Sequence, residues 1–198
     1  VTPMSAAPAA SRSERVIGVL YLDGRERSTM TSKARQSSLE AFATQAALPT
    51  QSARLYAESA EKARIDHDLK IAAEIQRNML PDPVFENSSV DLAAESIPCR
   101  TVGGDFYDYL EITDRGLGFA LGDVAGKGPP AALLAAAVQS NFVALAPVSS
   151  EPAETMARVN KALLRRAIDA RFATMFYGAV TADGRLSYCN AGQEPPLV

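Results

Sequence analysis

The sequence has 198 residues, of which 47% are hydrophobic, with a net charge of −3 and two cysteines. This composition predicts a globular protein with enough apolar mass for a core, and its charge gives no electrostatic reason to expect binding to nucleic acid or an anionic membrane. No uninterrupted apolar run approaches the roughly 20 residues of a membrane span, and the first residues lack the basic and apolar regions of a signal peptide. We therefore expect a cytoplasmic protein with reduced cysteines.

The first quarter of the chain predicts part of a domain rather than a whole one. Residues 1–14 are rich in Ala, Pro and Ser and are expected to be disordered. Residues 15–23 have the pattern of a buried strand, and a helix is expected from about residue 31. This strand, the helix and the stretch Ala53-Arg54-Leu55-Tyr56 resemble the C-terminal end of a GAF sensor domain. The resemblance implies that residues 15–48 are the remnant of such a domain.

Residues 49–80 have the composition of a linker helix. Pro49 is expected to kink or break the helix at its start, because proline lacks the amide proton and clashes one turn back. A heptad-spaced apolar seam runs along the segment and consists of Leu55, Ile65, Leu69, Ala72 and Met79. The seam indicates either a parallel coiled coil, hence a homodimer, or a single helix that lies on its own domain.

The remaining elements predict an α+β arrangement in layers. Pro81-Asp82-Pro83 is expected to end the linker helix. Strands are expected over residues 90–97, 106–112 and 117–124, and helices over residues 131–146 and 151–168. A β-hairpin over residues 172–181 and 186–190 is predicted by the turn dipeptide Asp183-Gly184.

Two acidic residues stand out because glycines flank them at the ends of expected strands. Asp105 follows Gly103-Gly104, and Asp123 follows Gly122. Two acids on adjacent strand ends bring oxygen ligands to one place, which is the kind of site that Mg²⁺ or Mn²⁺ favours.

Each of these motifs also has a simpler interpretation. Asp and Gly are common in ordinary turns. Residues 122–128 could form a phosphate loop, but Gly128 stands where a Mg²⁺-binding Ser or Thr is required. Gly103-Gly104-Asp105-Phe106 also partly matches the diguanylate cyclase signature, which has Glu where Phe106 stands.

Taken together, the motifs resemble the SpoIIE/RsbU branch of the protein phosphatase 2C (PPM) superfamily. The matching positions are residues 73–81, 98, 103–108, 122–128, 131–133, 172–175 and 190–192. The resemblance implies the αββα sandwich of that superfamily. Residues 81–198 would then be its N-terminal part, so that the expected fold is α+β with a partial sandwich.

The resemblance also implies metal-dependent hydrolysis of phosphoserine or phosphothreonine in a protein. Asp105 and the carbonyl of Val124 would bind metal, Asp123 would bridge two Mn²⁺ or Mg²⁺ ions, and a shared water would attack phosphorus. Arg100 and Lys127 are candidate phosphate-binding cations, although a solvated surface role fits each. The usual substrates of this branch are phosphorylated anti-anti-sigma proteins.

The sequence departs from the family pattern at two points. The family uses four acids, of which the later two follow the Asn190-Ala191-Gly192 motif, and Gln193 stands where many members have His. We therefore expect a truncated fragment with little or no activity by itself. A pseudophosphatase or signalling scaffold that binds a partner protein remains an alternative, as does a cyclic-nucleotide signalling enzyme.

Overall fold

The computed structural model describes residues 2–4, 18–20, 33–87, 89–112, 116–149, 151–165 and 172–197. The chain forms two compact units, Val1–Asp66 and His67–Val198, and each is considered by itself below.

The first unit contains a short antiparallel strand pair and most of a long helix. Strand β1 (Thr2–Met4) pairs with β2 (Gly18–Leu20), and helix α1 (Lys33–Met79) follows. The expectation of disorder is wrong for Thr2–Met4, because the apolar segment around Gly18 offers a strand edge with which these residues pair. The rest of the expected strand over residues 15–23 lies outside the described residues, as does the start of the expected helix.

Helix α1 continues through Pro49, so the break that was one of the two effects expected of this proline does not occur. A proline inside a helix costs about 3 kcal/mol, which the hydrogen bonds on either side of it in a 47-residue helix can offset. The hydroxyl of Thr50 also donates to the carbonyl of Ala46 at 2.8 Å, in the turn that contains Pro49. The helix ends at Met79, two residues before Pro81, where the sequence predicts its end.

The second unit is built on a four-stranded antiparallel sheet with the order β5-β6-β7-β8. A separate two-stranded sheet, β3 with β4, precedes it in the chain. The bounds of the strands are β3 Val84–Glu86, β4 Asp91–Ala93, β5 Phe106–Ile112, β6 Gly116–Val124, β7 Ala173–Val180 and β8 Leu186–Ala191. The sequence predicted the four strands of the larger sheet, but not β3.

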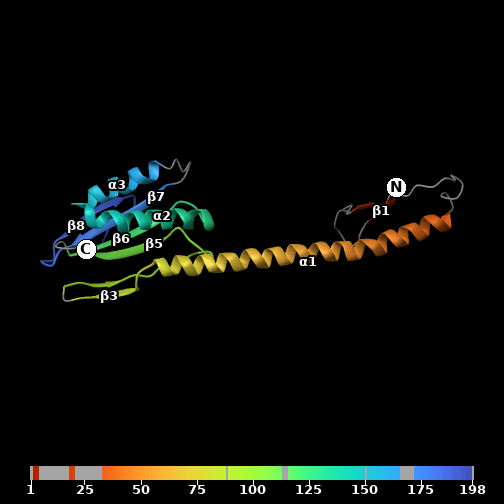
Figure 1. Cartoon of the computed structure of the whole chain (residues 1–198), viewed down its shortest axis with the longest axis horizontal. Coiled ribbons are helices and arrows are strands. Elements are labelled where there is room, and N and C mark those ends of the chain that lie inside the picture. Colours follow the sequence, from red (N-terminus) through yellow and green to blue (C-terminus); the bar gives the residue numbers. More distant parts are fainter. Residues whose placement is uncertain are drawn as a thin grey trace. The chain divides into compact units, whose positions relative to one another are not determined.

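Two helices, α2 (Pro129–Leu145) and α3 (Pro152–Leu164), cover one face of the larger sheet (Figure 1). The alternation along each strand points the apolar side chains of that face towards these helices. Phe142 of α2, which is fully buried, meets the ring of Tyr177 edge-on at a centroid distance of 4.9 Å. The core between helices and sheet also contains Phe106, Ala120, Val124, Leu134, Val138, Val159 and Met175.

The apolar composition of α2 follows from this position. Among the described residues, the segment Pro129–Val148 has the length and hydropathy of a helix that could cross a membrane, but 44% of it is buried in the protein. Its contacts with β5 and β6 explain why its residues are apolar.

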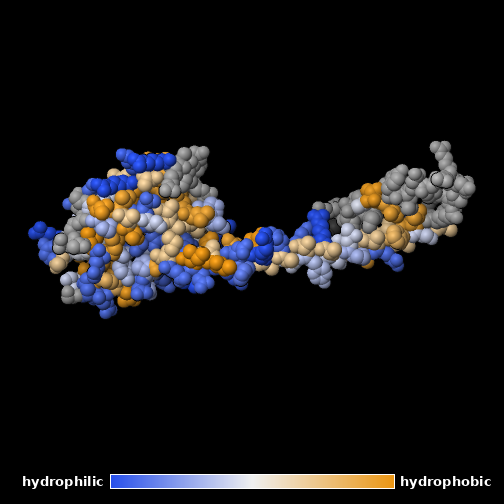
Figure 2. Space-filling model, viewed as in Figure 1, coloured by the Kyte–Doolittle hydropathy of each residue, from blue (hydrophilic) through white to orange (hydrophobic). Residues whose placement is uncertain are grey.

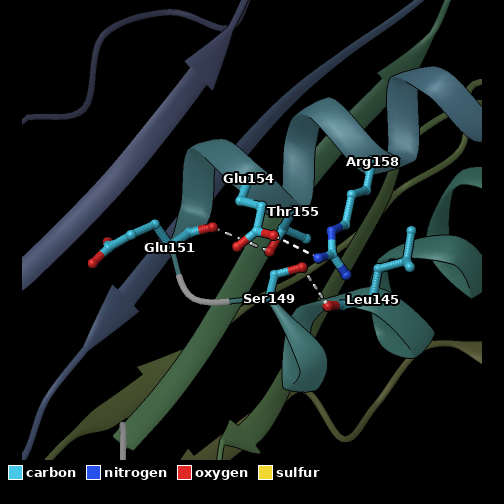
Figure 3. A network of polar contacts seen from close by, with 6 residues as sticks. All are labelled: Leu145, Ser149, Glu151, Glu154, Thr155 and Arg158. Carbon is cyan, nitrogen blue, oxygen red and sulfur yellow. Dashed lines mark hydrogen bonds and ion pairs between the residues drawn. The ribbon is translucent and has the colours of Figure 1, made fainter.

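A short polar network lies where α2 is connected to α3 (Figure 3). The connection includes the 3₁₀ turn η2 (Ala146–Val148). The buried Ser149 donates its hydroxyl to the carbonyl of Leu145 at 2.7 Å. The Thr155 amide donates to the carbonyl of Glu151 at 3.1 Å, and Arg158 pairs with Glu154 in the next turn. The bonds from Ser149 and Thr155 satisfy backbone carbonyls at the end of one helix and the start of the next.

Candidate metal centre

The register of the sheet explains why Asp105 and Asp123 lie together. Phe106 of β5 is opposite Gly122 of β6, so the next position along each strand places Asp105 beside Asp123. Phe106 faces the helices, and the alternation therefore puts both acids on the other face, at the end of the sheet.

The two carboxyl groups lie within hydrogen-bonding reach of each other. Burial raises the pKa of Asp105 above its ordinary value, and a hydrogen bond with Asp123 and the negative charge of Asp123 raise it further. Both residues are nevertheless exposed at the surface. An exposed pair of acids that repel each other in their charged forms is a place where a divalent cation would be stabilised.

Gly104 brings the backbone of Val124 close to this pair. The amide of Val124 donates to the carbonyl of Gly104 at 3.3 Å. A Cβ atom at residue 104 would come within 2.5 Å of the Val124 carbonyl oxygen, which is too close for any side chain. The glycine therefore leaves the space next to the carbonyl that the sequence predicts as a metal ligand.

Gly122 supports the packing of the core. It does not make a sharp turn, because β6 continues through it to Val124. Instead it makes room for a side chain of the core, since a Cβ atom here would lie 2.2 Å from the ring of Phe106. The chain turns later, at Gly126 and Gly128, which have positive φ angles of 119° and 72°.

A second group of residues beside Asp123 was not predicted as part of the site. Thr174, opposite Asp123 in the β6–β7 ladder, donates its hydroxyl to the Asp123 carbonyl at 3.4 Å. Gln193 donates from its side chain to the Thr174 hydroxyl at 3.0 Å. Asn190 holds this loop, because its side-chain oxygen accepts from the Gln193 amide at 2.9 Å. The Asn-Ala-Gly motif was the sequence signal for this loop, but nothing in it indicated the contact with Thr174.

The two candidate phosphate-binding cations lie in the loops that flank the acids. Arg100 is in the segment that leads to β5, and Lys127 is in the connection from β6 to α2. Both are exposed, and neither forms an ion pair with another described residue. Their position is compatible with either of the roles that the sequence left open.

The end of α1 is hydrogen-bonded to the segment that leads into β5 and contains Asp105. Gln76 forms two hydrogen bonds with the backbone of Gly103. On the helix-covered face of the sheet, the buried Gln139 of α2 donates to the Met79 carbonyl and to the Asp108 carboxylate, both at 2.8 Å. Tyr107 donates its hydroxyl to the carbonyl of Pro81 at 3.1 Å. These contacts involve only the last turn of α1, whereas Leu55 and Ile65 of the seam are exposed, so both interpretations of the seam stay predictions.

The residues present fit a hard divalent cation, although not a complete dinuclear set. They offer two carboxylates in contact, with space beside one backbone carbonyl, which are the ligands that Mg²⁺ and Mn²⁺ prefer. The described residues contain no group of three or more His, Cys, Asp or Glu side chains that could hold a metal. This part of the chain therefore supplies one half of a two-metal site at most.

Comparison with solved structures supports the class of fold. The SiaA-PP2C domain of Pseudomonas aeruginosa superposes with a TM-score of 0.50 at 27% sequence identity, over 63% of this chain and 51% of that chain. The α+β fold of the second unit is of the PP2C type.

Comparison with known sequences finds similarity to one family of bacterial phosphatases. Residues 113–198 match the family model for Stage II sporulation protein E (SpoIIE). The chain is 29% identical to the phosphoserine phosphatase RsbU of Bacillus subtilis, over 66% of this chain and 39% of that protein. It is 27% identical to RsbP, another phosphoserine phosphatase of that bacterium, over 69% of this chain and 35% of that protein. The chain thus spans less than half the length of these relatives, and its C-terminal part is similar to SpoIIE/RsbU-type phosphatase domains.

Proposed function

We propose that the chain carries part of the active site of a metal-dependent protein serine/threonine phosphatase in bacterial signalling. The contact between the Asp105 and Asp123 carboxyl groups, on the sheet face that the helices leave open, is the observation that carries this proposal. The similarity to two phosphoserine phosphatases supports the class of reaction.

The residues of this chain would supply part of the ligand set of two Mn²⁺ or Mg²⁺ ions and would orient the phosphorylated substrate. Asp105, Asp123 and the Val124 carbonyl would be the ligands that this chain contributes. Bound divalent ions supply a water of lowered pKa and neutralise charge on the phosphoryl oxygens. Arg100, which precedes Asp105 in the chain, and Lys127, which follows Asp123, are both exposed and would attract the phosphate dianion.

The proposed substrate is a phosphoserine protein of the anti-anti-sigma type, dephosphorylated in the cytoplasm. The resemblance of the sequence motifs supports this class. Because only two carboxylates are available in the described residues, we expect turnover by the 198-residue chain to be slow.

The test is phosphate release from a phosphoserine anti-anti-sigma protein, with this chain in excess over the substrate and with or without Mn²⁺. We expect slow release that requires Mn²⁺ and is lost in Asp123→Asn. Asp183→Asn is the matched control, because Asp183 lies in the turn between β7 and β8, where it pairs with Arg185. Release that persists in Asp123→Asn would contradict the assignment of the site.

The second candidate is a pseudophosphatase or scaffold that binds a partner without chemistry. The observation that favours it is the lack of a third acidic ligand among the described residues. Absence of any Mn²⁺-dependent release, together with binding of the phosphoserine protein, would favour this scaffold over the enzyme.

We also propose that α1 dimerises in parallel through the N-terminal part of its seam. Leu55 and Ile65 are 57% and 48% exposed, and apolar atoms lie among polar ones along α1 (Figure 2). Ile65→Glu should therefore give monomers in light scattering, whereas Ile71→Glu, off the seam and 45% exposed, should leave the dimer intact. A monomeric unmodified chain at high concentration would contradict the proposal.

A further inference from the structure

Gln76, near the end of α1, binds one residue of the Gly103-Gly104-Asp105 motif through both ends of its amide group. Its Nε2 donates to the Gly103 carbonyl oxygen at 2.7 Å, and its Oε1 accepts from the Gly103 amide at 3.1 Å. Both bonds are partly buried. A single side chain thus satisfies the donor and the acceptor of one backbone residue, which fixes the peptide planes on both sides of it.

Fixing the backbone by hydrogen bonds matters more at Gly103 than it would at another type of residue. Glycine has the largest conformational freedom of all residues, and here two glycines in succession precede a candidate metal ligand. The next residue, Gly104, is held from the opposite side by the Val124 amide. The segment that aims Asp105 is therefore fixed between α1 and β6, by Gln76 on one side and by Val124 on the other.

We propose that Gln76 is a positioning residue of the metal centre, which holds Gly103 so that the carboxylate of Asp105 faces Asp123. Only an amide side chain of this length fulfils the role. Glutamate cannot donate to the Gly103 carbonyl, and asparagine is one methylene shorter. This inference deepens the proposed function, because the position of Asp105 matters for chemistry only if the acid pair binds a divalent cation.

Gln139 provides an internal comparison for this inference. It also binds the end of α1, but through the Met79 carbonyl, and its other partner is the Asp108 carboxylate. Asp108 lies on the helix-covered face of the sheet, away from Asp105 and Asp123. Loss of Gln139 should therefore weaken the docking of α1 without releasing the Gly103 backbone.

The experiment compares the 198-residue chain with its Gln76→Met and Gln139→Met variants. Methionine keeps the length and helix propensity of glutamine but can neither donate nor accept as the amide does. Mn²⁺ affinity is measured from the electron paramagnetic resonance signal of free Mn²⁺, and amide exchange at residues 103–105 is measured by NMR. Urea unfolding of each variant shows whether it is folded.

We expect Gln76→Met to weaken Mn²⁺ binding by about tenfold or more, as is typical when a residue that orients a metal ligand is lost. Exchange at Gly103 should become faster in the same variant. Gln139→Met should lower stability but leave both readouts unchanged. Equal Mn²⁺ affinity in Gln76→Met and the unmodified chain, or an equal loss in Gln139→Met, would overturn the inference.

The proposed metal function and the proposed role of Gln76 can be tested separately. If Asp105→Asn and Asp123→Asn bind Mn²⁺ as the unmodified chain does, the proposed metal function is wrong. The exchange measurement still decides whether Gln76 holds this segment. Unchanged exchange at residues 103–105 in Gln76→Met would overturn the inference even if the metal function is correct.

Discussion

The two faces of the four-stranded sheet are made by the same strands, but one face is buried under helices and the other contains the candidate site. On the face covered by α2 and α3, Val124 and Phe142 are fully buried. On the other face, Leu121 and Tyr188 are 51% and 54% exposed, and the acid pair lies at the end of the strands. Because successive side chains of a strand point to opposite faces, the neighbours Asp123 and Val124 lie on opposite faces, Val124 in the core and Asp123 in the candidate site.

The division extends to the glycines of the two motifs. Gly122 makes room for Phe106 on the helix-covered face, whereas Gly104 makes room beside the Val124 carbonyl next to the acid pair. One glycine thus supports packing and the other supports the candidate site.

Truncation of Phe142 should show how much the helix-covered face contributes to stability. Phe142→Ala removes a fully buried ring that packs against Tyr177, and we expect a loss of about 3–5 kcal/mol in the free energy of unfolding. Leu121→Ala, on the open face, should cost less than about 1 kcal/mol. Urea denaturation of both variants measures the difference. Similar losses would show that the open face is also part of the core.

Gly104→Ala should damage the candidate site and the fold together. The added methyl group would lie 2.5 Å from the Val124 carbonyl oxygen, so the strand ends must separate, at a cost of about 1–3 kcal/mol. Mn²⁺ binding should be lost as well. Gly103→Ala is the neighbouring control, because its nearest contact is a side-chain atom of Pro98 at 3.1 Å. If Gly104→Ala has the stability and Mn²⁺ affinity of the unmodified chain, the close approach is not important.

The pH dependence of stability should separate Asp108 from an ordinary exposed acid. Burial raises the pKa of Asp108 above its ordinary value, although hydrogen bonds from Gln139 and from the Tyr109 amide partly offset this increase. A raised pKa means that the folded state binds the proton more tightly than the unfolded state. The contribution of this carboxyl group to stability is therefore greatest below the unfolded pKa and is lost as the pH rises through the folded pKa.

Asp108→Asn has no such proton to lose. Its free energy of unfolding, relative to that of the unmodified chain, should therefore increase between about pH 3.5 and pH 7. Urea denaturation across this range measures the difference. A constant difference, or one that decreases with pH, would contradict the assignment of a raised pKa to Asp108.

Much of the fold could be predicted from the sequence, because its signals were local. The strand over residues 106–112 has the predicted bounds, and Asp183-Gly184 forms the turn of the β7–β8 hairpin, with a φ of 80° at Gly184. The continuation of α1 through Pro49 was not predicted. The free-energy cost of one proline is local, whereas the stabilising hydrogen bonds are summed over the whole helix. The pairing of Thr2–Met4 with Gly18–Leu20 was not predicted, because the two segments are far apart in the sequence and no local pattern joins them.

The acids of the candidate site were identifiable from the glycines beside them, but their supports were not. Gln76 lies 27 positions before Gly103, and Thr174 lies 51 positions after Asp123. Such contacts depend on how the elements pack, and a single sequence contains no local pattern that indicates them. For the same reason, the sequence placed Gln76 within the matching run 73–81 but gave it no role in the site.

The central claim is that Asp105 and Asp123 form one cation site on the open face of the sheet. Titration of the 198-residue chain with Mn²⁺, followed by the broadening of its backbone amide signals in NMR, tests this claim most directly. We predict that the amides of residues 103–105 and 122–126 broaden first, and that this effect is lost in both Asp105→Asn and Asp123→Asn but kept in Asp183→Asn. Broadening that begins elsewhere, or that persists in either of the first two variants, would contradict the claim.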